Sequence, residues 1–117
     1  MADYRNLEVW KLAHQLALRI HRATIEFPTH ERYALSSQIR RSAVSIAANI
    51  AEGAGRVSDP DFARFVAIAA SSANETEYHA LLARDLGYLT AESHGEMADL
   101  IARVRSMLTN LRKTLIA

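Results

Sequence analysis

Apolar residues recur at steps of three and four along most of the chain, which is the spacing of amphipathic α-helices. The clearest case is the segment 35–53, where an apolar row and a small polar row occupy adjacent helix faces. The apolar row is Leu35, Ile39, Ala43, Ile46 and Ile50, and the polar row is Gln38, Ser42, Ser45, Asn49 and Glu52. A solvent-facing row would more usually carry Lys and Glu. We therefore predict that this helix is central and that its polar row packs against another element.

The same periodicity predicts three further helices. We place the four helices at about residues 6–26, 35–54, 59–87 and 90–115. Phe27-Pro28 is expected to end the first helix, because the residue before a proline is pushed out of helical geometry. Gly53 and Gly87 are expected to end the second and third in a left-handed conformation, and Ser58 is expected to cap the third. Four long helices with short connections predict one all-α domain over residues 1–117, an antiparallel up-down-up-down four-helix bundle.

Composition agrees with few, long helices. Half of the residues are hydrophobic, but only 7% are aromatic and the chain has four glycines and two prolines at which to turn. The chain has no cysteine, so thiolate chemistry is excluded and we expect a cytoplasmic location. The longest uncharged runs are about ten residues, too short to span a bilayer at about 20. We accordingly expect no membrane association, and the charged N-terminal segment does not read as a signal peptide.

The formal net charge is only +1, but it is unevenly distributed along the chain. Residues 1–56 hold eight Lys or Arg against five Asp or Glu, residues 57–100 hold two against eight, and residues 101–117 hold four against none. An acidic segment between two basic ones indicates helices that attract one another within or between subunits. From the charge distribution alone, we favour this attraction between helices over the alternative that the basic segments form a binding surface.

No residue pattern predicts a catalytic or metal centre. A di-iron carboxylate bundle needs Glu-x-x-His on two helices, and no Glu in this chain has a His three residues later. Glu75 and His79 are four apart without a second copy, and His14 and His21 share a helix face without an evident third ligand. Serines in mid-helix usually bond back to the preceding turn rather than act as nucleophiles. We expect no enzymatic activity, no metal and no cofactor.

The most suggestive polar set is Gln38, Asn49, Glu52 and Glu75. Asn49 and Glu52 border the apolar row of the central helix, and Glu75 lies on the long helix predicted alongside. Two neighbouring carboxylates could share a proton, as in acid–base catalysis. The interpretation that we favour is a buried hydrogen-bond network that fixes the register of the second and third helices.

Seven basic residues lack neighbouring acids in the sequence and are candidates for binding a phosphate backbone. They are Arg40, Arg41, Arg56, Arg103, Arg105, Arg112 and Lys113. In one chain they form a modest, solvated patch, but in a ring of identical subunits they would repeat around an axis and produce a strong potential. The small polar row of 35–53 and the Ala- and Ser-rich middle of 59–87 offer more packing surface than one core can use. This surplus predicts such a closed ring.

The segment 35–53, L-x-x-Q-[IL]-R-R-x-A-x-S-I-x-x-N-I-A-E-G, resembles the signature of a family of small four-helix-bundle proteins. These proteins are encoded in intervening sequences of bacterial 23S ribosomal RNA genes. The resemblance continues through Leu7, Trp10, Ala13, Phe27-Pro28, Glu31, Ser58, Phe62, Arg64-Phe65, Ile68-Ala69, Ser72, Glu75 and Leu86-Gly87-Tyr88. It covers most of the chain.

The best-known relatives of that family, the accessory proteins of diversity-generating retroelements, look like pentameric barrels of this bundle. Their basic surface engages nucleic acid and a reverse transcriptase. The resemblance therefore implies a non-enzymatic homo-oligomer, a pentamer, whose partners are RNA or DNA, or a reverse transcriptase or other protein. A protein-interaction scaffold with no nucleic-acid affinity of its own stays open as the alternative.

Overall fold

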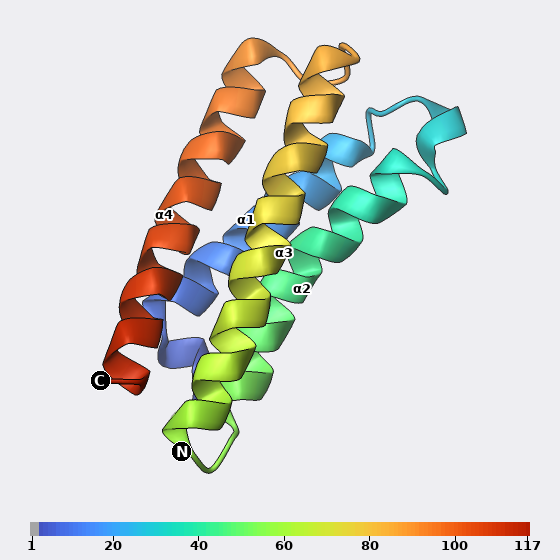
Figure 1. Ribbon diagram of the computed structural model, residues 1–117. Coiled ribbons are helices and arrows are strands. Elements are labelled where there is room, and N and C mark those ends of the chain that lie inside the picture. Colours follow the sequence, from blue (N-terminus) through green and yellow to red (C-terminus); the bar gives the residue numbers. More distant parts are fainter. Residues whose placement is uncertain (1–2) are drawn as a thin grey trace.

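The structure is a computed structural model that describes residues 3–117. It contains α1 (Glu8–Thr24), α2 (Leu35–Ala54), α3 (Asp59–Asp85) and α4 (Ala91–Leu115), with short 3-10 helices η1 (Tyr4–Asn6) and η2 (Thr29–Glu31). Successive helices run in opposite directions (Figure 1), and α4 closes the bundle by contacting both α3 and α1. The predicted all-α up-down-up-down bundle is confirmed. The observed helix ends lie within about two residues of the expected ones, which is the usual uncertainty of helix boundaries.

The predicted apolar rows meet along the axis of the bundle. The largest fully buried side chains come from α1, α2 and α4: Leu16, Ile20, Ile39, Ile46, Ile50, Met97, Ile101 and Leu108. The helix α3 instead contributes mainly small residues, Ala69, Ala73, Ala80 and Ala83. Large side chains on three helices therefore pack against a slender fourth one, and the molecule is elongated, 43 × 23 × 20 Å.

The helices α2 and α3 approach closely at Gly53. This glycine lies inside α2 and does not have the left-handed conformation, so the prediction that it ends the helix in that conformation is wrong. A Cβ at this position would lie 2.8 Å from Phe62 Cδ1 and 2.8 Å from Phe65 Cβ. Gly53 is needed because the first turn of α3 occupies the space of a side chain.

Gly87 ends α3 as the sequence predicts. It has a φ of 83°, and the Tyr88 N–H donates to the Ala83 carbonyl at 2.9 Å, the hydrogen bond that typifies a glycine-ended helix. Tyr88 then packs its ring on Phe27, with centroids 5.4 Å apart, and donates its hydroxyl to Glu31 at 2.8 Å. The hydrogen bond to Glu31 raises the pKa of the Tyr88 phenol. The α1–α2 and α3–α4 connections are thereby tied together at one end of the bundle.

We expect Gly53→Ala to lower the free energy of unfolding by about 1–3 kcal/mol, because the added methyl group overlaps the side chains of Phe62 and Phe65. Gly95→Ala is a matched control: it lies inside α4 with no atom within 4 Å of the added Cβ. It should raise the free energy by about 0.5–1 kcal/mol through helix propensity. Urea denaturation measures both, and an unchanged stability of Gly53→Ala would contradict the close approach.

Candidate functional site

Small polar side chains of α2 and α3 form hydrogen bonds across the interface between these helices. The hydroxyl oxygens of Ser45 and Ser72 are 2.8 Å apart. Asn49 Nδ2 donates to the carbonyl oxygen of Ser45 at 2.8 Å and to its hydroxyl at 3.0 Å. The polar row of α2 therefore does pack against another helix, as its small residues predicted.

A second set of hydroxyls continues the network toward the other end of α3. Thr76 donates to Ser42 Oγ at 2.9 Å, and Ser42 Oγ lies 3.3 Å from Nδ1 of His79. Burial lowers the pKa of His79, and the nearby Glu75 carboxylate, 3.7 Å from Nε2, partly opposes this. The imidazole of His79 is therefore neutral at pH 7, and its Nδ1 can accept a hydrogen bond from the Ser42 hydroxyl.

Ser42, His79 and Glu75 follow one another in the order of a nucleophile, a base and an orienting acid. The Ser42 hydroxyl is nevertheless unsuited to attack a substrate. Ser42 is only 4% exposed, and its hydroxyl also bonds to the carbonyl of Ile39 in the preceding turn at 3.2 Å. This geometry supports the network interpretation, in which the hydroxyls fix the register of α2 against α3.

The membership of the network differs from the set proposed from the sequence. Asn49 belongs to it, and Glu75 touches it through the His79 ring. Glu52 is exposed and pairs instead with Arg56 at 2.8 Å. Gln38 is exposed and lines a groove between α2 and α3. No hydrogen bond within residues 3–117 joins the two carboxylates, so the structure provides no proton-sharing pair.

Three network members on α3 were missed: Ser72, Thr76 and His79. These three residues are spaced by four and three positions, like the polar row on α2. This spacing is the sequence signal from which a matching polar row on α3 could have been predicted. Part of the small-residue surface of α2 and α3 is thus used inside one chain, while Ser71 stays exposed and Ala67 and Ala70 line a groove. The ring expected from this surface stays a prediction.

The seven candidate arginines and lysines fall into two groups. Arg40, Arg56 and Arg105 are engaged within the chain: Arg40 donates to α1, Arg56 pairs with Glu52, and Arg105 pairs with Glu77 at 3.0 Å. Arg56 also lies over the Phe65 ring, 4.7 Å from its centroid. Arg56 and Arg105 are partly neutralised by carboxylates and are weaker candidates for a phosphate contact, whereas Arg40 keeps its charge but is held against α1, away from α4.

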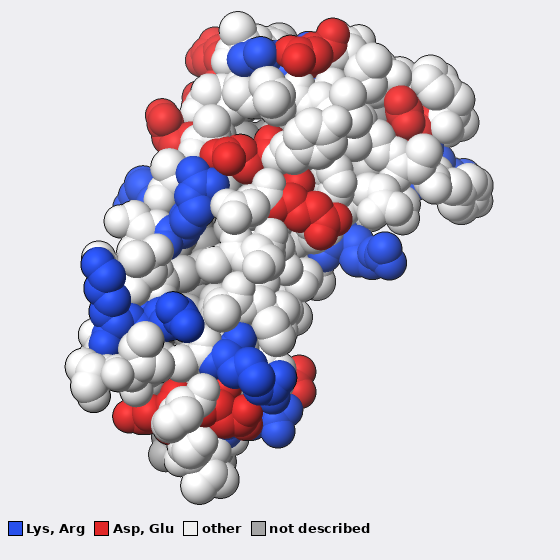
Figure 2. Space-filling view, in the orientation of Figure 1, with Lys and Arg blue, Asp and Glu red and all other residues white. Residues whose placement is uncertain are grey.

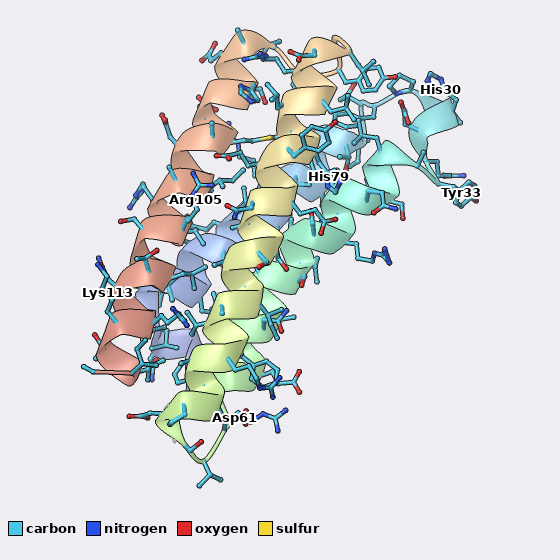
Figure 3. All side chains as sticks on the ribbon, viewed as in Figure 1. His30, Tyr33, Asp61, His79, Arg105 and Lys113 are labelled. Carbon is cyan, nitrogen blue, oxygen red and sulfur yellow. The ribbon has the colours of Figure 1, made fainter. Side chains whose placement is uncertain are left out.

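The other four, Arg41, Arg103, Arg112 and Lys113, are exposed and make no ion pair with any residue of the described chain. Arg103 lies at the midpoint of α4, and Arg112 and Lys113 lie in its C-terminal half. Arg103 is nine residues from Arg112 and so points to the opposite side of the helix, and we call Arg112 and Lys113 the α4 basic surface. Figure 2 shows blue atoms along that half of α4 and red atoms near its other end, and Figure 3 labels Lys113 there. Arg112 and Lys113 border a groove of about 280 Å³ whose α3 wall is Val66, Ala67 and Ala70.

Across residues 3–117, no three His, Asp or Glu side chains gather closely enough to hold a metal ion. None of the helices in that range combines the length and apolar character needed to cross a membrane.

The fold and these side chains define a four-helix bundle with a structural polar interface and a basic outer surface. The model of the family described as 23S rRNA-intervening sequence protein matches residues 5–110, and the chain belongs to this family. The chain is also similar to a crystal structure from Bacteroides thetaiotaomicron, a protein of unknown function from the S23 ribosomal protein family. The two are 30% identical with a TM-score of 0.81, and the match covers 90% of this chain and 98% of the other. No protein with a curated description matches.

We expect Thr76→Val to lower the free energy of unfolding by about 1–3 kcal/mol, because a nearly isosteric change removes the buried donor to Ser42. Asn49→Ala should also lower the free energy of unfolding. Glu52→Ala is the control, since an exposed ion pair contributes less than about 1 kcal/mol. Chemical denaturation compares the three, and equal stabilities would show that the network does not hold α2 against α3.

Proposed function

We propose that this protein is a non-enzymatic, homo-oligomeric bundle that binds the phosphate backbone of nucleic acid through the α4 basic surface. The observation that carries the proposal is the pair of adjacent exposed cations, Arg112 and Lys113, which form no ion pair with any residue from 3 to 117. Membership in a family described by its 23S rRNA intervening sequences supports an association with nucleic acid.

The charge around this surface favours a polyanion. Residues 101–117 contain four Lys or Arg and no Asp or Glu, while the acids of α4 lie in its first turns. Arg112 and Lys113 stand at the edge of a groove between α3 and α4, where a chain of phosphates could lie alongside both helices. Uncompensated cations of this kind supply sequence-independent affinity by releasing counterions from the polyanion.

Base readout is not expected at this surface. Sequence-specific binding to single strands requires aromatic side chains on which bases stack. The strongly exposed tyrosines, Tyr33 and Tyr78, belong to the α2–α3 side of the molecule rather than to α4. The interaction should therefore be driven by phosphates and should be sensitive to salt.

We expect Arg112→Glu combined with Lys113→Glu to weaken binding of any RNA or DNA about equally and to lower the salt dependence, with the log–log slope falling by about 2. Lys11→Glu with Arg84→Glu is the matched control, because it makes the same change in net charge at residues already paired with acids. Fluorescence titration at several salt concentrations measures the slope. An unaltered slope in the α4 variant would contradict this binding surface.

The oligomer that we propose uses a contact other than the small-residue rows of α2 and α3. A groove of about 410 Å³ lies between α2 and α3, with the mainly apolar side chains of Ala34, Leu35, Tyr78, Leu82 and Leu86 and the polar side chains of Glu31, Gln38 and His79 in its lining. Tyr78 and Leu86 remain 60% and 49% exposed, and exposed apolar clusters of this kind often mark subunit interfaces. We propose that copies of the chain associate through this α2–α3 groove, with five copies as the family resemblance implies.

We expect light scattering to give a mass of five times the 13.0 kDa chain at micromolar concentration. Tyr78→Glu should shift the mass toward the monomer, because a carboxylate would be buried at the contact. Val57→Glu is the control, since Val57 is fully exposed in the connection at the opposite end of α3. A wild-type mass near 13.0 kDa would overturn the oligomer.

The second candidate function is a protein-interaction scaffold without affinity for nucleic acid. The same α2–α3 groove favours it, because its apolar side chains could receive a side chain of a partner such as a reverse transcriptase. Absence of nucleic-acid binding at low salt by an intact oligomer would favour this scaffold over the proposed function.

A further inference from the structure

A separate pocket lies where α1 ends and α2 begins, at the opposite end of the bundle from the C-terminus of α4 (Figure 1). It has a volume of about 290 Å³. Its polar walls are Arg32, Arg40, Ser36 and Thr29, and Phe27 and Pro28 form part of its apolar side. No Asp or Glu of the described chain lines it, so its charge is uniformly positive.

Ser36 is the most informative residue of this pocket. The residue is 5% exposed and lines the cavity, and no hydrogen bond joins its hydroxyl to any residue from 3 to 117. No fully buried side-chain oxygen or nitrogen of the described chain lacks a partner, so the Ser36 hydroxyl oxygen is reached by solvent rather than sealed in the core. The hydroxyl of Ser36 is therefore available to a ligand in the cavity.

Arg40 is held in position beside it. Its Nε donates to Thr24 Oγ1 at 2.6 Å, and its Nη2 donates to the carbonyl oxygen of His21 at 3.4 Å. Thr24 in turn donates to the carbonyl of Ile20 at 2.8 Å. Two anchored nitrogens fix the plane of the guanidinium and leave Nη1 free to donate. A fixed guanidinium of this kind suits an oxyanion.

A second guanidinium comes from Arg32, which directly follows η2 in the chain. Its side chain is exposed and forms no ion pair in the described part of the molecule. The nearest acid in sequence, Glu31, is engaged elsewhere: its Oε2 accepts from Tyr88 at 2.8 Å and its Oε1 from the Leu35 amide at 3.3 Å. The charge of Arg32 is therefore not cancelled locally.

The first turn of α2 adds backbone donors to these side chains. The cap residue Ala34 offers no side-chain acceptor, and the Leu35 amide is taken by Glu31. The amides of Ser36 and Ser37 have no acceptor among the described residues. They lie at the positive end of the helix dipole, which favours an anion.

We infer that this pocket binds one phosphate monoester group. The two guanidinium groups, the Ser36 hydroxyl and the Ser36 amide belong to residues that line the pocket and can donate to a tetrahedral dianion, and Phe27 and Pro28 offer a surface for the rest of the ligand. The group belongs either to a small phosphorylated molecule or to the 5′ end of a nucleic acid. This site shares no residue with the α4 basic surface, so a test of one does not decide the other.

The test is titration of the whole protein with inorganic phosphate, followed by amide NMR, against sodium chloride at the same ionic strength. Phosphate should give saturable shifts at the Ser36 and Ser37 amides. Arg32→Ala and Ser36→Ala should each weaken phosphate binding by about tenfold or more, as expected for loss of a hydrogen bond to a charged group. Arg22→Ala, an exposed arginine of α1 outside the pocket, should leave the affinity unchanged.

Ser36→Ala also separates binding from folding. Because its hydroxyl has no partner in the chain, the variant should melt at the wild-type temperature while it loses affinity. Shifts that rise linearly with phosphate, equal shifts in chloride, or equal affinities of the wild-type and Ser36→Ala proteins would each overturn the site.

The source of the phosphate is decided by two further ligands. Ribose 5-phosphate tests the small-molecule source. A 5′-phosphorylated oligonucleotide and its 5′-hydroxyl twin, compared in the Arg112→Glu/Lys113→Glu protein, test the nucleic-acid end. If the protein prefers the phosphorylated oligonucleotide and Ser36→Ala abolishes this preference, the pocket binds a nucleic-acid end. If ribose 5-phosphate binds saturably and that preference is absent, the pocket binds a small molecule. Binding of neither ligand would overturn the monoester site.

Discussion

The close packing of α2 against α3 is the constraint on which the rest of the structure depends. Side-chain hydroxyls are short, so they can bond to one another across two helices only where the backbones are near. Gly53 at one end of the interface and the alanines and serines along it permit that distance. Once the Ser45–Ser72 and Ser42–Thr76 contacts form, a shift of one helix along the other would leave buried hydroxyls without partners.

This use of small residues decides where function can reside. Most side chains of the α2–α3 interface are engaged with each other, so the binding that we propose lies on outer faces of the molecule. We assign it to the α4 basic surface, the α2–α3 groove, and the pocket between the end of α1 and the start of α2. They differ in chemistry, and this would allow a nucleic acid, a second copy and a phosphate group to bind without competing.

The unequal charge along the chain contributes to cohesion between helices and to the binding that we propose. Arg19 of α1 pairs with Glu96 of α4, and Arg105 of α4 pairs with Glu77 of α3, so some basic residues do hold helices together as the acidic middle segment indicated. Exposed pairs of this kind add little stability. These pairs matter more for where positive charge remains: they neutralise particular arginines, while Arg112 and Lys113 form no ion pair with the described residues and stay exposed on the outer surface.

The sequence by itself determined the four helices, their alternating direction and the polar row of α2, because these follow from local periodicity and chain connectivity. It also marked the family through residues 35–53. It could not say that Gly53 serves a close approach rather than a helix end, because that depends on Phe62 and Phe65 from the next helix. Nor could it rank seven basic residues or find the partnerless Ser36 hydroxyl. A side chain's partners come from other helices, and only the tertiary structure brings those helices together.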